Sequence, residues 1–275
     1  EKTADGFTLA QMDLRLRHVS LPDGTVVDGT NAAKVLMHDV YWNYPVEESD
    51  GIFASVASAA FDKVLGGIGD VDVTKLVSAV ERGAKEGRLI AWMRNDDEQN
   101  AIKETGIDAS LPDPDDPSAD PVAGVYFNNL SFSKLDWYLN ADTQIGQGVK
   151  NGDGTCSYRI TVTLTNIMTQ EEAGKLPDYV AASAPGAARD DERLNVSVFA
   201  PTGGNISDLT VEGTQFGLGA ATWHGIPFYS GTVDLHAGET TTITYTLTTS
   251  AETGDKPLTL RQTPTCQAAR DSASA

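Results

Sequence analysis

The chain has little positive charge, few cysteines and no long apolar run, and each shortage excludes a class of protein. Its 275 residues carry 39 acidic and only 20 basic side chains, a formal charge of −19. Such a surface repels a phosphate backbone and an anionic bilayer. No apolar run approaches the ~20 residues that cross a membrane. The sequence therefore predicts no nucleic-acid partner, and we expect any membrane anchor to lie outside this chain.

Two cysteines are too few for a disulfide scaffold, and neither lies in a CxxC or zinc-binding motif. Cys156 begins the strand-like segment CSYRITVTLTN, and Cys266 follows another such segment, PLTLRQTPT. A bond between them would close a loop of roughly 110 residues and stabilise the fold by on the order of 4–5 kcal/mol. An even cysteine count beside a β-rich region favours an oxidising compartment. We therefore expect a Cys156–Cys266 disulfide and export; two unrelated thiols are the alternative.

The first 111 residues show helical segments and few strands. Apolar residues recur at helical spacing in 31–44, 52–65 and 73–86. Residues 88–93 (RLIAWM) predict a buried strand, and a short helix is expected to follow, from Asp96 to Gly106. The pattern predicts a mixed α/β module over residues 1–111, with about four helices, that looks like part of a larger domain.

The sequence pattern changes after residue 111. Residues 112–121 are predicted to be a linker, because the stretch LPDPDDPSADP is rich in proline and aspartate. Whether Asp113–Asp120 bind an ion stays open, since the carboxylates lack the spacing of a calcium loop. From residue 122 apolar and polar residues alternate with a period of two, in short segments rich in Val, Thr, Ile and Tyr. These predict an antiparallel Ig-like β-sandwich over 122–266 and a disordered tail over 267–275, hence an α+β fold class.

Common catalytic and cofactor-binding motifs are absent. The sequence contains no GxSxG, P-loop, GxGxxG, HExxH or EF-hand pattern, and its four histidines are scattered. We predict that His38 and Asp39 form a solvent-exposed pair rather than an acid–base unit. We therefore expect no catalytic residue, no metal ligand and no cofactor, and we favour a non-enzymatic role.

Aromatic residues are the candidates for ligand binding. Tyr41, Trp42 and Tyr44 lie together in YWNYP, and Trp137 and Tyr138 lie in a strand-like segment. These rings could stack on a sugar, but packing of one module on the other is the favoured interpretation. Because successive strand residues face opposite sides, at least one of the second pair should be exposed or at a domain contact. A sugar-binding module would show an exposed aromatic platform flanked by amides.

Five segments carry a family resemblance. LPDGTVVDGTNAAKVLMHDVYWNYP, GRLIAWMRNDDEQ, GVYFNNLSFSKLDWYL, CSYRITVTLTN and GTVDLHAGETTTITYTL follow one another in this order. The arrangement, over residues 21–265, resembles the C-terminal portion of a bacterial cell-surface family known as domain of unknown function four thousand and twelve. That family is common in high-GC Gram-positive bacteria, and its members are typically anchored by an N-terminal membrane helix. The resemblance implies an extracytoplasmic cell-surface protein.

A weaker similarity links residues 27–36 and 53–65 to the end of the LytR-CpsA-Psr enzymes, which transfer lipid-linked glycopolymers to peptidoglycan. Those enzymes hold a pyrophosphate with arginines around this helix. Here EESDGIF brings three acids and no arginine, which would repel such a ligand. A pocket formed by Arg82, Arg88 and Arg94 would support the transferase. We favour a module that binds or positions envelope components or protein partners; a glycopolymer transferase and a carbohydrate-binding module are the alternatives.

Overall fold

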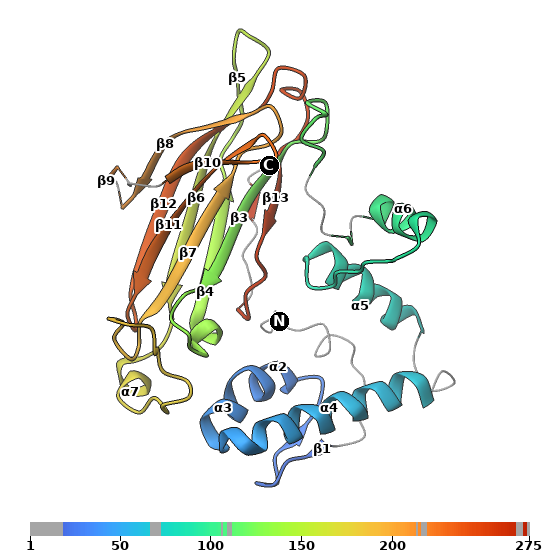
Figure 1. The fold of residues 1–275 in the computed structure, drawn as a ribbon, viewed down its shortest axis with the longest axis vertical. Coiled ribbons are helices and arrows are strands. Elements are labelled where there is room, and N and C mark those ends of the chain that lie inside the picture. Colours follow the sequence, from blue (N-terminus) through green and yellow to red (C-terminus); the bar gives the residue numbers. More distant parts are fainter. Residues whose placement is uncertain are drawn as a thin grey trace.

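The computed structural model describes residues 19–66, 73–105, 107–108, 112–212, 214–215, 219–267 and 272–273. It confirms the α+β fold class, with helices in the first part of the chain and sheets in the second (Figure 1). We call residues 19–108 the helical module and residues 112–267 the β-module.

The helical module is built from short strands and helices. Its elements are β1 (Val19–Ser20), β2 (Val26–Val27), α2 (Ala32–Lys34), the π-helical turn η1 (Val35–Asp39), α3 (Val40–Asn43), α4 (Val46–Gly66), α5 (Val73–Lys85) and α6 (Asp96–Thr105). Val27, Val40 and Val56 are buried in one cluster, because the apolar faces of the first helices and α4 pack on the β1–β2 hairpin. None of the described helices is both long and apolar enough to cross a membrane.

The strand predicted over residues 88–93 is wrong. No residue of this segment pairs with a described strand, although the Ala91 amide donates to the Ile107 carbonyl at 2.9 Å. Ile90 and Trp92 are 63% and 73% exposed. A short apolar run does not by itself reveal whether a segment is buried, because burial depends on which elements pack over it.

The β-module contains two sheets. The five-stranded sheet has the order β10-β11-β7-β3-β13, and the seven-stranded sheet has the order β14-β4-β6-β12-β8-β9, with β5 beside β6. The strands are β3 (Val122–Asn129), β4 (Leu139–Ile145), β5 (Val149–Lys150), β6 (Cys156–Asn166), β7 (Glu192–Phe199), β8 (Asn205–Val211), β9 (Thr214–Gln215), β10 (Gly219–Trp223), β11 (Ile226–Leu235), β12 (Thr240–Thr248), β13 (Thr259–Gln262) and β14 (Ser272–Ala273). The described pairs are antiparallel except β13 with β3 and β14 with β4.

The two sheets share one hydrophobic core. Ile160, Val162 and Leu164 of β6 are fully buried, as the alternation predicts, and they belong to the same cluster as Leu194 and Val196 of β7 in the other sheet. Threonines between the β6 residues face outward. Of the predicted disordered tail, residues 268–271 and 274–275 lie outside the described residues, and Ser272–Ala273 form β14.

Two short helices lie at the end of the β-module nearest α3 (Figure 1). The 3-10 helix η2 (Leu135–Tyr138) occupies the first part of a segment that the sequence predicts as a strand. The helix α7 (Gln170–Ala173) begins with a capping box, in which Thr169 and Glu172 each bond the other's backbone amide.

The predicted Cys156–Cys266 disulfide is wrong, since both thiols are free. Cys156 lies at the start of β6, where its amide donates to Thr249. Cys266 lies near Trp137, whose carbonyl accepts from the neighbouring Gln267 side chain, at the end of the module where β6 finishes. Ten steps along β6 at about 3.3 Å each separate the two ends by about 30 Å. A disulfide needs α-carbons within about 7 Å, so these cysteines cannot bond in this fold.

Candidate binding groove

The aromatic residues singled out from the sequence lie mostly at the contact between the modules. Tyr41, Trp42 and Trp137 pack on a cluster that contains Leu135 and the buried Tyr138. The fifth candidate, Tyr44, packs elsewhere, on the core of the helical module. The structure therefore brings four of the five rings together between η2, α7 and the first helices. Their role in ligand binding stays a prediction.

His38 lies at the centre of this contact, so the prediction that it forms a solvent-exposed pair with Asp39 is wrong. Its side chain is only 15% exposed. Nδ1 lies 2.7 Å from an Asp39 carboxylate oxygen, and Nε2 lies 2.8 Å from the Tyr138 hydroxyl. The Trp42 ring stacks on the imidazole, with 5.4 Å between ring centroids. Burial raises the pKa of Tyr138, and the nearby Glu172 carboxylate raises it further.

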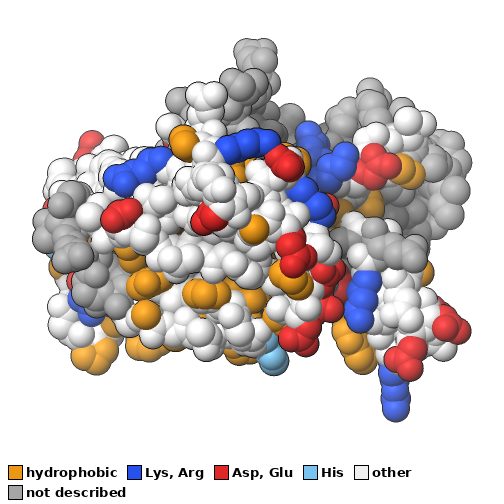
Figure 2. Space-filling model, turned by 90° about the horizontal axis from the view of Figure 1, so that it is seen from above, with side chains coloured by type: hydrophobic (Ala, Val, Ile, Leu, Met, Phe, Trp, Pro, Cys, Tyr) orange, Lys and Arg blue, Asp and Glu red, His pale blue; other side chains and the backbone are white. Residues whose placement is uncertain are grey.

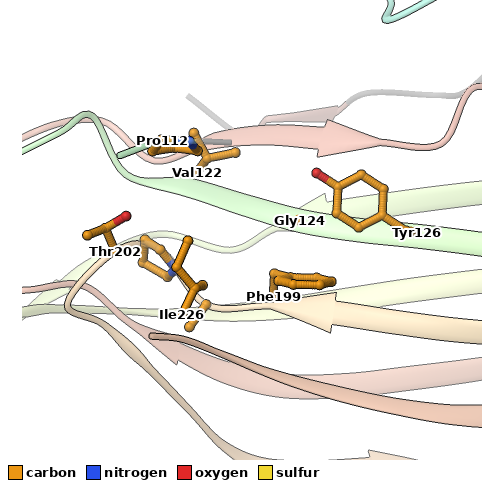
Figure 3. Close-up of a pocket in the computed structure, with 9 residues that line it drawn as sticks. Pro112, Val122, Gly124, Tyr126, Phe199, Thr202 and Ile226 are labelled. Carbon is orange, nitrogen blue, oxygen red and sulfur yellow. The ribbon is translucent and has the colours of Figure 1, made fainter. Parts of the chain in front are cut away.

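A different surface forms an open groove, on the outer face of the five-stranded sheet. The groove has a volume of about 710 Å³, within the range of ligand sites. It is lined by Pro112, Pro114, Tyr126, Asn128, Ser197, Phe199, Trp223, His224 and Ile226. A narrow cleft of about 10 Å³ continues it at one end; there Pro112 and Val122 lie beyond the rings of Tyr126 and Phe199 (Figure 3).

Strand register explains why these side chains share one face. Residues that pair across β3, β7 and β11 point to the same side of the sheet. Phe199 pairs with Phe228 on one side and with Gly124 on the other. Two residues along, Ser197 pairs with Ser230 and Tyr126, and the next position pairs Asn195 with Asn128. The outer face thus carries two polar rows beside Phe199 and Phe228, and the Tyr126 ring leans from its own row over Gly124 to join them; we call these three rings the aromatic row.

The aromatic row is tightly packed. Phe199 and Phe228 are stacked with centroids 4.7 Å apart and planes at 10°, and the Tyr126 ring meets Phe199 edge-on at 5.5 Å. Tyr126 leans over Gly124: a β-carbon there would lie 2.9 Å from the Tyr126 ring and 3.0 Å from the Phe199 β-carbon. Glycine therefore allows the tyrosine to lie along the sheet. Burial raises the pKa of Tyr126, and the charge of Arg261 opposes that shift.

The polar rows form a hydrogen-bonded cluster. The Ser230 hydroxyl donates to the side-chain oxygen of Asn195 at 2.9 Å, and the side-chain nitrogen of Asn195 donates to the Ser197 hydroxyl at 3.3 Å. The two serine hydroxyls are 2.9 Å apart. Among the described residues, nothing hydrogen-bonds the exposed Asn128 amide, which lies beside this cluster. Its two donors and its acceptor are available to a ligand.

One wall of the groove is the β10–β11 hairpin. His224 and Gly225 connect Trp223 to Ile226 with φ of 45° and 82°, as a two-residue type I′ turn requires. The tight turn fixes Trp223 at the rim, where it is 53% exposed. Pro112 and Pro114, from the segment predicted as a linker, form another part of the wall.

The segment that contains these prolines is bound to the β-module. The Ser250 hydroxyl donates to the Pro117 carbonyl at 3.0 Å, and Lys256 pairs with Asp120 at 2.9 Å. Asp113 and Asp116 accept bonds from backbone amides two residues further on, in local turns. No group of three or more His, Cys, Asp or Glu side chains within the described residues could hold a metal ion.

The groove residues are not among those predicted from the sequence, although the sequence contains a signal for them. In GVYFNNL and RLNVSVF, most residues between the core positions are aromatic, amide or hydroxyl, where the equivalent positions of β6 are mostly threonine or serine. Alternation alone identifies these positions as outward facing. It cannot show that β3 and β7, about 70 residues apart in the chain, pair in a register that joins their side chains.

Fold and groove together define a two-module α+β protein with a polar and aromatic groove on the outer face of a sheet. No protein-family model matches the chain, and the search of curated proteins finds no match either.

Proposed function

We propose that this chain is a non-enzymatic cell-surface module that binds or positions a component of the cell envelope, and that the groove is its binding site. The observation that carries the proposal is the groove itself. It combines two partly buried rings and the exposed Trp223 with free and pre-oriented polar groups, as ligand sites do. The groove contains no paired acid and base placed for chemistry, which is why we favour binding over catalysis.

We propose an extracytoplasmic location, with a membrane anchor outside this chain. The family resemblance of residues 21–265 supports it. The cysteines no longer do, because they are free and so give no indication of an oxidising compartment. An Ig-like β-sandwich is the architecture we propose for the β-module, on the basis of its two sheets around one core.

A glycopolymer transferase is less well supported. Arg88, the middle one of the three arginines that would form such a pocket, pairs with Glu86 at 2.8 Å and donates to the Thr265 carbonyl at 3.0 Å. These contacts take up two of the guanidinium donors and place a carboxylate where a pyrophosphate would bind. Arg82 and Arg94 lie exposed on either side of it in the chain.

Sedimentation with cell-wall sacculi of a high-GC Gram-positive bacterium tests the proposal. We expect the protein to pellet with sacculi, and Phe199→Ala to reduce the bound fraction by about tenfold, since stacked aromatic anchors carry much of a binding energy. The matched control is Trp92→Ala, which removes a larger and more exposed ring from the helical module. Failure of the wild type to pellet, or equal losses in both variants, would contradict the proposal.

A further inference from the structure

We propose that the groove binds an uncharged polysaccharide, with a sugar ring stacked on Tyr126 beside Phe199 and sugar hydroxyls bonded to Asn128 and Ser197. This inference rests on the proposed function and names the ligand class of the same site.

Charge is the first argument. Charged residues make up 21% of the chain, yet the groove lining contains no Asp, Glu, Lys or Arg. Acidic side chains gather instead where the β-module faces α5 and α6, while hydrophobic ones follow the lower flank of the β-module in the view from above (Figure 2). An anionic polymer would need cationic partners in the groove and would meet a net charge of −19 around it. Arg261 of β13 pairs with Gly124 and its charge acts on Tyr126, so a cation lies beside the groove, but it is not part of the lining, which therefore suits a neutral ligand.

Ring geometry is the second argument. The hydrophobic face of a pyranose is a flat array of C–H groups, which packs on an aromatic face while the ring's hydroxyls point sideways. On the groove floor the Tyr126 ring lies over Gly124 and meets Phe199 at an interplanar angle of 80° (Figure 3), while Phe228 covers one face of Phe199, so Tyr126 is the ring that offers a face. Trp223 lines the rim. Three rings on three different strands hold fixed positions, so little conformational entropy is lost when a ligand binds.

Hydroxyl recognition is the third argument. A sugar hydroxyl both donates and accepts, and so do the groups beside the aromatic row. The Asn128 amide is exposed and unbonded among the described residues, one row away from Ser197 and Tyr126. Because Ser230 donates to Asn195 and Ser197 to Ser230, both hydroxyl hydrogens are used within the cluster, and the Ser197 oxygen is held in place as an acceptor for a sugar hydroxyl.

A proline-rich peptide is the competing occupant, because aromatic grooves also bind polyproline helices. The chain's own Pro112 and Pro114 already lie against this groove. Peptide recognition of that kind needs donors aimed at backbone carbonyls between the rings. Here the polar groups form rows beside the rings and include acceptors as well as donors, which suits hydroxyls better.

Isothermal titration calorimetry with defined probes tests the inference. The neutral probes are the hexasaccharides of glucose, mannose and N-acetylglucosamine; the others are poly(glycerol phosphate) and a proline-rich decapeptide. We expect at least one neutral hexasaccharide to bind, and Tyr126→Leu and Asn128→Ala each to weaken it by about tenfold. The control Asn205→Ala removes an exposed amide from β8 and should leave affinity unchanged. Because no ion pair forms, the dissociation constant should change less than about twofold between about 50 and about 500 mM salt.

The outcomes separate the inference from the proposed function. If no neutral hexasaccharide binds, or if the decapeptide or the polyanion binds in its place, the ligand class is wrong, while sedimentation with sacculi still decides whether the groove is a binding site. If a neutral sugar binds with equal affinity to Tyr126→Leu and Asn128→Ala, the site lies elsewhere and the inference fails. Circular dichroism and the thermal midpoint establish that each variant is folded.

Discussion

Glu192 is a carboxyl group at a core-facing position. It begins β7, two residues before the buried Leu194, and is fully buried; neither of its side-chain oxygens has a hydrogen-bond partner among the described residues. Burial raises its pKa to about 9, and the charges of Asp136 and Asp191 add to the shift. At neutral pH this side chain is therefore protonated in the folded protein and ionised in the unfolded chain.

The first prediction is that stability falls with rising pH on account of Glu192. Its folded pKa exceeds the ordinary value of 4.5, so the stability is fully present below that pH and is lost as pH rises toward 9. Glu192→Gln should remove that slope and stabilise the fold by on the order of 2–3 kcal/mol at about pH 7. Urea denaturation from about pH 5 to about pH 9 measures it. The exposed Glu252→Gln is the control; identical pH profiles for wild type and Glu192→Gln would disprove the assignment.

At the scale of strands, alternation predicts much of the β-module and little of the groove. The core positions of β6 follow from sequence because a period of two fixes which side is buried. The groove depends on the register of β3 on β7 and on a tight turn at His224, and both arise from long-range pairing. The predictions of the disulfide and of the strand over 88–93 were wrong for a related reason. A sequence indicates local conformation, but it does not show at which end of the module a cysteine lies or which strand a segment pairs with.

The aromatic row depends on the close approach of β3 and β7 at Gly124, which gives a second prediction. Gly124→Ala should force the Tyr126 ring off the sheet, because its new methyl would lie 2.9 Å from that ring. We expect a cost of about 1–3 kcal/mol and a fall in thermal midpoint of several degrees. Gly219→Ala on β10 is the control, since a β-carbon there meets nothing within 4 Å. A midpoint for Gly124→Ala no lower than for Gly219→Ala would contradict this account.

At the scale of the whole molecule, the two modules meet through the imidazole of His38. The Asp39 carboxylate accepts from Nδ1–H within the helical module, with 2.7 Å between the two atoms. Nε2 lies 2.8 Å from the hydroxyl of Tyr138, which belongs to the β-module. The Trp42 ring stacks on the same imidazole. One side chain therefore carries both a hydrogen bond and a ring contact at the junction.

The third prediction is that the hydrogen bonds of His38 hold the contact between the modules. His38→Phe keeps a ring to stack on Trp42 but removes the bonds to Asp39 and Tyr138. Because the Tyr138 hydroxyl then loses this partner, we expect a cost of about 1–3 kcal/mol at the contact. Hydrogen exchange of η2 and α7 should become faster relative to the core of β6. Exchange at the wild-type rate in the variant would rule out His38 as the link.

The parallel pairing of β13 with β3 has a consequence for the order in which this protein can fold. Thr259 pairs with Val122, more than a hundred residues earlier, so this edge of the five-stranded sheet closes only after Thr259–Gln262 have left the ribosome. Until then β3 presents an unpaired edge next to the aromatic row. The nascent chain keeps this edge open until β13 emerges, and β13, which contributes no lining residue, completes the sheet on which the groove lies.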